Sequence, residues 1–131
     1  MRKSIKTVLL LSACLGGYMA VAAEATENND QIDQAIYQCE RGVVVPVTYL
    51  NTSNGGSYAV VQVEGQQVAM NIEVSASGAR YLSIDEKRPY SWHTKGSSAT
   101  LFWQPADEPD NSVILLSECS TGAEMFAENT Q

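Results

Sequence analysis

The sequence predicts an all-β fold, a small antiparallel barrel or sandwich of about eight strands. Short apolar or aromatic stretches alternate along the 131-residue chain with turn signals about every eight to twelve residues, the spacing typical of these folds. Residues 68–74 carry the clearest strand pattern, with an apolar side chain at every second position. After the N-terminal leader no stretch has a convincing helical pattern.

Four strands are expected in the first half of the domain, at residues 35–40, 43–50, 58–63 and 68–74. Pro46 interrupts the second of them, and because proline cannot donate to a ladder, this predicts an edge strand or a bulge. The Asn, Thr, Ser and Gly cluster at 51–56 predicts a turn, and Glu64-Gly65 predicts the next one.

Four further strands are expected at residues 81–85, 90–93, 100–103 and 113–116, the last leading into Cys119. Two turn signals, Ser77-Gly78 and Lys95-Gly96, stand beside these apolar and aromatic stretches. Each turn would present an exposed polar side chain, a hydroxyl from one and a cation from the other. The stretch from Ser75 to Gly96 is therefore the first candidate for a functional surface.

Residues 1–23 are predicted to be a signal peptide. A positively charged start is followed by an apolar or small stretch at 7–21, and Ala20-Val21-Ala22 fits a small-x-small cleavage site. The apolar run is shorter than the ~18 residues that span a membrane. Cleavage here would leave a soluble protein in the periplasm.

A lipoprotein signal is the alternative, because Leu11-Ser12-Ala13-Cys14 has the form of a lipobox in which Cys14 is acylated. The apolar run before Cys14 is only at the ~7-residue minimum of a leader, and the chain stays apolar where a lipoprotein tether is normally polar. These features favour cleavage by the first route, with an outer- or inner-membrane lipoprotein as the other outcome.

The remaining chain divides into three parts. Residues 24–34 are polar and acidic and are expected to form a flexible linker. Residues 35–120 are expected to form the domain, which is large enough to fold alone with modest stability. Residues 121–131 have weak patterning and are expected to fray.

The charge of the chain limits its partners. Its formal net charge is −7, and removal of the leader leaves five Lys and Arg residues against fifteen Asp and Glu residues, a difference of −10. Such an acidic surface repels nucleic acid and anionic lipid and attracts basic partners. Solubility alone would also explain the charge.

The predicted export would place the cysteines of the domain in an oxidising compartment. With Cys14 removed or acylated, Cys39 and Cys119 remain near the two ends of the domain. In an oxidising compartment one disulfide between them would close a loop of about 80 residues. Two distant cysteines and the single His93 do not make a metal-ligand set, and no cofactor is expected.

No complete enzyme constellation is present in the sequence. A serine triad would depend on His93, and Ser77-Gly78 lacks the Gly-x-Ser-x-Gly elbow. The paired acids Asp85-Glu86 and Asp107-Glu108 lie in loops, where carboxylates are ordinarily solvated. There is no glycine-rich phosphate loop. Enzyme activity is therefore disfavoured.

The motifs resemble those of the C-type lysozyme inhibitor family, the membrane-bound and periplasmic group of Gram-negative bacteria. The likeness covers residues 36–119 and is specific in the order and content of its motifs. The matching residues are Ile36-Tyr37-x-Cys39, Ser75-Ala76-Ser77-Gly78-Ala79-Arg80-Tyr81, Trp92-x-Thr94-Lys95-Gly96-x-x-Ala99-x-Leu101 and Cys119.

The resemblance implies an eight-stranded antiparallel β-barrel with a Cys39–Cys119 disulfide. It also implies a protein that blocks c-type lysozyme by inserting loops into the catalytic cleft, which protects the cell wall and evades host defence. In the family a serine and a lysine carry the inhibition, and they match Ser77 and Lys95. The adjoining motif positions Thr94, Arg80 and Tyr81 are expected to belong to the same partner-binding set.

The chain departs from the family pattern in one place, because the connection between Tyr81 and Trp92 is longer, with residues 85–89 as the extra material. This puts the spacing of Ser77 and Lys95 in question. Members of the family can form homodimers, and an exposed edge near Pro46 is compatible with one. The alternative function is an envelope-structural barrel that binds a glycan or another partner without inhibiting an enzyme.

Overall fold

The structure, a computed structural model, describes residues 16–17 and 27–122. Cys14 and nearly all of the predicted signal peptide lie outside these residues, as does the tail from residue 123. No helix in the described ranges is long and apolar enough to cross a membrane. The strands are β1 (Gln31–Gln38), β2 (Val44–Asn51), β3 (Ser57–Val63), β4 (Gln66–Glu73), β5 (Ala79–Ser83), β6 (Tyr90–Lys95), β7 (Ser98–Trp103) and β8 (Val113–Ser120).

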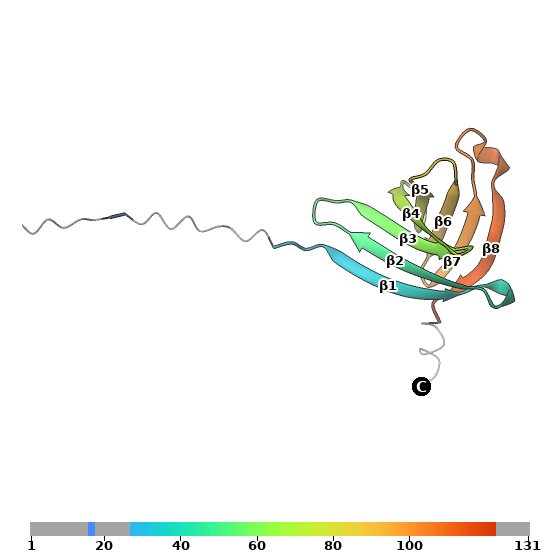
Figure 1. Ribbon diagram of the computed structural model, residues 1–131, viewed down its shortest axis with the longest axis horizontal. Helices are drawn as coiled ribbons and strands as arrows, with labels where there is room; N and C mark the ends of the chain where they lie inside the picture. The colour runs from blue at the N-terminus through green and yellow to red at the C-terminus, as the bar shows by residue number, and fades with distance from the viewer. Residues whose placement is uncertain (1–15, 18–26, 123–131) are drawn as a thin grey trace, which may run out of the picture.

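These eight strands form a closed barrel in which every strand pairs antiparallel with its neighbours in chain order. Figure 1 shows the strands following one another around the barrel from β1 to β8. The all-β prediction is confirmed, and of the two predicted architectures the protein forms the barrel and not the sandwich. Two short 3₁₀ turns, η1 (Glu40–Gly42) and η2 (Pro109–Asn111), are the only helical elements in the described ranges.

Alternating side chains fill the barrel interior. In β2 and β3 the buried positions are four Val residues, whose branched side chains suit a pleated surface, and Ala59. Larger side chains from β4, β6 and β7 complete the packing. The principal buried residues are Val45, Val47, Ala59, Val61, Val63, Val68, Met70, Trp92 and Leu101.

Three aromatic residues form a polar cluster inside this core. The rings of Tyr37 and Trp92 meet edge to face with centroids 5.0 Å apart. The Trp92 Nε1–H donates to the hydroxyl of Tyr49 at 2.9 Å, and the Tyr37 and Tyr49 hydroxyls share a hydrogen bond of 2.7 Å. Burial and the Tyr37 hydrogen bond raise the pKa of Tyr49. The cluster thus satisfies polar groups that would otherwise be costly to bury.

The antiparallel order assigns every connection to one of two ends. The connections 52–56, 74–78 and 96–97 lie at what we call the first end of the barrel. The connections 39–43, 64–65, 84–89 and 104–112 lie at the second end. Connections that follow even-numbered strands therefore lie together at the first end, and those that follow odd-numbered strands lie together at the second end.

The barrel closes at a narrow seam between β1 and β8. Only one residue pair, Gln38 with Ser120, joins these strands, and the Cys39–Cys119 disulfide lies directly beside it. Two side chains of η1 then satisfy the backbone of β8: the Ser117 N–H donates to Glu40 Oε1 at 3.0 Å, and Arg41 donates to the Leu115 carbonyl at 3.5 Å.

Three predictions about the strands need correction: where the first strand begins, whether Pro46 lies in an edge strand, and which side chains at the end of β4 are buried. Strand β1 begins at Gln31, so residues 31–34 belong to the barrel and not to the predicted linker. Strand β2 is paired on both sides, so Pro46 does not mark an edge strand; its ladder to β3 starts at Val47, and Pro46 faces only β1. Ile72 and Val74 continue the apolar alternation of β4 but are exposed.

Removal of the disulfide should destabilise the barrel strongly, because it restores the entropy of an unfolded loop with a sequence separation of 80 residues. The double substitution Cys39→Ala/Cys119→Ala is expected to lower the free energy of unfolding by about 4 kcal/mol on the chain-entropy model. Urea denaturation of the variant, with chemically reduced wild type as the comparison, measures this. A loss below about 1 kcal/mol in both proteins would contradict it.

Candidate functional site

Ser77 and Lys95 lie together at the first end of the barrel. Ser77 belongs to the 74–78 connection that leads into β5, and Lys95 ends β6, the neighbour of β5. Both residues are exposed, and both line one groove of about 260 Å³. Two residues 18 positions apart in sequence are thus presented on the same surface.

A close backbone contact fixes the position of the 74–78 connection. Gly78 has a φ of 68°, and a Cβ built on it would lie 2.1 Å from the carbonyl oxygen of Thr94. Only glycine can adopt this conformation at this distance from another backbone. The pair Ala79–Thr94 continues the same contact into the β5–β6 ladder. The Ser77 loop is therefore held against the strand that carries Lys95.

The two loops are also supported locally. The Ser75 hydroxyl donates to the Ser77 carbonyl at 2.9 Å, which closes the 74–78 connection on itself. Beside Lys95, the Thr121 N–H donates to the Ser97 carbonyl at 3.1 Å and ties the β6–β7 turn to the end of β8. These contacts limit the freedom of both side-chain positions before any partner binds.

The Lys95 ammonium is available to a partner. Within the described part of the chain, ion pairs are made by Arg41, Arg80 and Arg88 and not by Lys95. Lys95 is exposed, so its charge is solvated in the free protein. A partner that supplies carboxylates and excludes water would therefore gain a new ion pair without breaking an existing one.

Arg80 has a different environment. Its guanidinium is bonded to Glu73, its cross-strand neighbour on β4, and its Nε is buried with no hydrogen-bond partner in the described region. Because its charge is already paired, Arg80 supports the site more than it offers a free cation. Thr94 is half-buried and lines the groove next to Lys95.

Tyr81 does not lie on the surface. Its side chain is 6% exposed and points into the barrel, where its ring centroid is 5.6 Å from that of Tyr49. Burial raises the pKa of its hydroxyl. Tyr81 therefore offers little surface to a partner in the free protein, and its ring supports β5 from inside the barrel. A direct contact with a partner stays a prediction.

Residues that the sequence analysis did not assign to the site complete the groove. His93, Thr100 and Phe102 line it together with Ser98. The ring centroids of His93 and Phe102 are 4.4 Å apart, and His93 Nε2 is 2.7 Å from the hydroxyl of the buried Ser91. The two-residue alternation of β6 and β7 was the signal that could have placed these side chains on one face.

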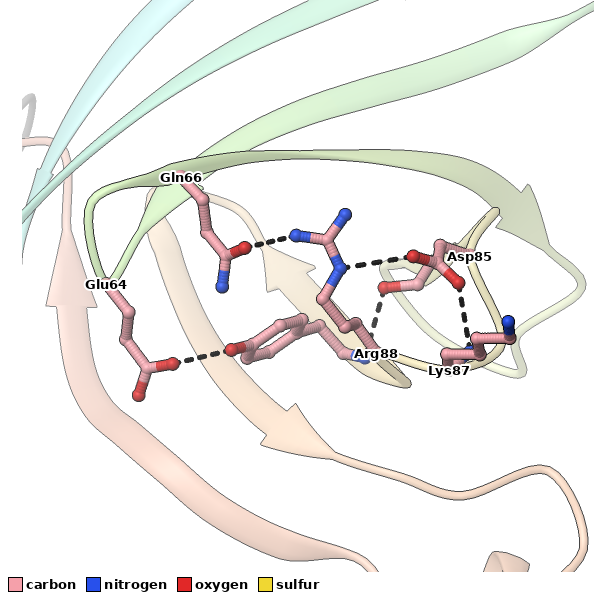
Figure 2. A network of polar contacts seen from close by, with 7 residues as sticks. Glu64, Gln66, Asp85, Lys87 and Arg88 are labelled. Carbon is pink, nitrogen blue, oxygen red and sulfur yellow. Dashed lines mark hydrogen bonds and ion pairs between the residues drawn. The ribbon is translucent and has the colours of Figure 1, made fainter.

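The longer connection at 84–89 does not disturb the site, because it lies at the second end of the barrel. Figure 2 shows how it is pinned: Arg88 contacts Asp85 within the connection and Gln66 at the start of β4. The Tyr90 hydroxyl donates to Glu64 at 2.5 Å. The spacing of Ser77 and Lys95 is therefore set by the β5–β6 ladder and not by the extra residues.

The described residues contain no group of three His, Cys, Asp or Glu side chains arranged to hold a metal ion. The groove carries hydroxyls, one lysine and two rings, but within the described ranges no carboxylate lines it. Such a set can donate hydrogen bonds and one positive charge. It suits recognition of an anionic or carboxylate-bearing partner.

Gly78 and Gly96 form a matched pair for testing the close contact. Both have positive φ, but an added Cβ would clash with the Thr94 carbonyl only at Gly78 and would meet nothing within 4 Å at Gly96. Gly96→Ala should cost about 1 kcal/mol of unfolding free energy from backbone strain alone. Gly78→Ala should cost clearly more in the same urea titration. Equal losses would contradict the contact.

His93 should contribute to the pH dependence of stability. Burial, and then the nearby Arg80 charge, lower its pKa below 6.5, against a smaller opposing effect of Glu73. The folded state thus favours neutral His93. The contribution of His93 to the free energy of unfolding is therefore fully present above about pH 6.5 and is lost as the pH falls below that value. Between about pH 8 and pH 5, wild type should lose more unfolding free energy than His93→Gln. Parallel losses would contradict this.

Comparison with known proteins identifies the family. The family model described as membrane-bound lysozyme-inhibitor of c-type lysozyme matches residues 37–110. A relative from Cupriavidus necator, described as a membrane-bound lysozyme inhibitor of C-type lysozyme, is 30% identical over 118 residues, which cover 89% of each protein.

Two solved structures share the fold. PliC-St, a periplasmic lysozyme inhibitor of C-type lysozyme from Salmonella typhimurium, aligns with a TM-score of 0.57 and 31% identity over 69% of this chain and 96% of that one. Pseudomonas aeruginosa MliC, solved in complex with hen egg white lysozyme, aligns with a TM-score of 0.51 and 35% identity over 58% of this chain and 77% of that one. The family model and this relative show that the chain belongs to the family of membrane-bound lysozyme inhibitors of c-type lysozyme.

Proposed function

We propose that this protein inhibits c-type lysozyme by inserting Ser77 and Lys95 into the catalytic cleft of the enzyme. The observation that carries the proposal is that both side chains are exposed on one groove at the first end of the barrel. Family membership supplies the enzyme class, and a relative has been solved in complex with a lysozyme.

The chemistry of the target suits Lys95. Retaining glycosidases such as lysozyme place two carboxyl groups about 5 Å apart on either side of the bond that they cleave. A lysine carries a compact charge on a long flexible stem, so its ammonium can enter such a cleft and contact either carboxylate. Once water is excluded, this ion pair is stronger than it would be at an open surface.

Ser77 would add a directed hydrogen bond to the same carboxyl pair, since a hydroxyl that donates to a carboxylate makes a short, charge-assisted bond. Thr94 lines the groove beside Lys95 and can contribute a second hydroxyl. Arg80, bonded to Glu73, would serve to hold β5 beside β4. Blocking the two carboxyl groups removes the acid and the nucleophile of the reaction together.

Long-range electrostatics would assist the encounter. The chain has a formal net charge of −7, which the lost leader would make more negative. A basic lysozyme would be attracted to this surface, and the association rate should fall as salt screens the attraction. The single lysine in the groove then provides local complementarity to an acidic cleft inside an otherwise basic enzyme.

We further propose that the mature protein acts in the periplasm. A disulfide at Cys39–Cys119 fits an oxidising compartment outside the cytoplasm. There the inhibitor would share a compartment with the peptidoglycan that it is proposed to protect. Whether it is released by cleavage near Ala22 or anchored through Cys14 depends on residues outside the described ranges.

Substitution of the two site residues tests the proposal. Lys95→Ala should raise the inhibition constant in a cell-wall lysis assay by about thirtyfold or more, because truncating a desolvated charged contact costs roughly 2–5 kcal/mol. Ser77→Ala should weaken inhibition by a smaller factor. Both variants should unfold at the wild-type urea concentration, since neither side chain is buried.

Two matched controls lie at the second end of the barrel, where Lys87 and Ser112 are exposed. Lys87→Ala and Ser112→Ala should leave inhibition at the wild-type value. Wild-type potency in Lys95→Ala and Ser77→Ala would instead remove these residues from the site. Binding to peptidoglycan in a pull-down, with none to immobilised lysozyme, would favour the alternative of a glycan-binding envelope protein.

A further inference from the structure

Two apolar side chains at the end of β4, Ile72 and Val74, are not buried in the core. The alternation that buries Val68 and Met70 continues to Ile72 and Val74, yet these two are 45% and 94% exposed. Val74 is the most exposed of the large apolar side chains in the described ranges. The sequence thus continues a core-facing pattern past the point at which the core ends.

Packing inside the barrel explains the exposure. Ile72 is paired with Tyr81, and the Tyr81 ring contacts Tyr49 and fills the interior at this level. Strand β4 ends at Glu73, so Val74 projects beyond the last ladder pair. No other strand of the described ranges buries this side chain, which is 94% exposed.

Exposure alone does not indicate a binding surface, because isolated apolar residues are common on protein surfaces. The position of Ile72 and Val74 close to Ser77 is the more informative observation. Val74 is three residues from Ser77, so their Cα atoms are within about 11 Å of each other. Both belong to the connection that Gly78 fixes against β6. Glu73 lies between Ile72 and Val74 in sequence, but by the two-residue alternation its side chain faces the opposite side of β4, where it is bonded to Arg80. The two apolar side chains therefore lie just before the loop that carries Ser77, without a charged side chain between them on their own face.

We infer that Ile72 and Val74 form an apolar flank of the docking surface, which packs against an apolar wall of the enzyme cleft when Lys95 enters it. This inference rests on the proposed function. Clefts that bind organic ligands are lined largely by apolar and aromatic side chains with a few polar groups between them. An inhibitor that fills such a cleft needs both kinds of surface.

The apolar flank also strengthens the polar contact. Energetically modest contacts around a central charged residue exclude water from it, and the lower local dielectric strengthens the ion pair. The effects of Val74 and Lys95 on affinity should therefore be coupled. Removing the apolar contact matters most while the Lys95 ammonium is present to benefit from it.

The isosteric substitution Val74→Thr tests the flank, because it changes polarity with little change in shape. It should raise the inhibition constant about fivefold or more, as expected for losing much of the burial of one apolar side chain. Val113, which is 56% exposed at the start of β8, provides the matched control. Val113→Thr should stay within about twofold of wild type.

The double variant Val74→Thr/Lys95→Ala tests the coupling, and its inhibition constant should rise by less than the product of the two single effects. Wild-type potency in Val74→Thr, or equal losses in Val74→Thr and Val113→Thr, would overturn the inference. These outcomes are distinguishable from failure of the proposed function, in which the wild-type protein itself would not inhibit lysozyme.

Discussion

Closure of the barrel at the β1–β8 seam is the constraint on which the rest of the structure depends. The sheet is continuous everywhere else, but here one residue pair, Gln38 with Ser120, joins the first strand to the last. The adjacent disulfide supplies covalently what the ladder lacks, and Glu40 satisfies the backbone of β8 that β1 leaves unpaired. A small barrel with a modest core gains most from a crosslink placed where its hydrogen-bonded ladder is shortest.

With the barrel closed, the β5–β6 ladder positions the candidate site. Gly78 lies on the Thr94 carbonyl, and this one backbone approach brings the Ser77 loop against the strand that ends in Lys95. Trp92 of β6 packs edge to face against Tyr37 and donates a hydrogen bond to Tyr49, which fixes this part of β6 from inside the barrel. An inhibitor that must hold two side chains in a fixed relation needs such a scaffold, because ordering flexible loops on binding would reduce affinity.

The two ends of the barrel have separate roles. The second end is bound into a network in which Arg88 contacts both Asp85 and Gln66. The first end leaves the Lys95 ammonium without an ion pair among the described residues and exposes Val74 in the connection that carries Ser77. The 84–89 connection is thus held by contacts of its own, whereas the Lys95 ammonium is left available where the protein is proposed to bind. A longer connection at 84–89 can therefore be accommodated without changing the site.

The sequence by itself determined the strands, the turns and the family, because two-residue alternation, glycine-containing turns and ordered motifs are local properties of the chain. It also selected Ser77 and Lys95, which the fold then brings to one groove. Only the tertiary structure decided that Tyr81 lies inside, that Val74 lies outside and that His93 lines the groove. Alternation shows which residues share a face of a strand, but the level at which the barrel interior is full depends on how all eight strands pack together.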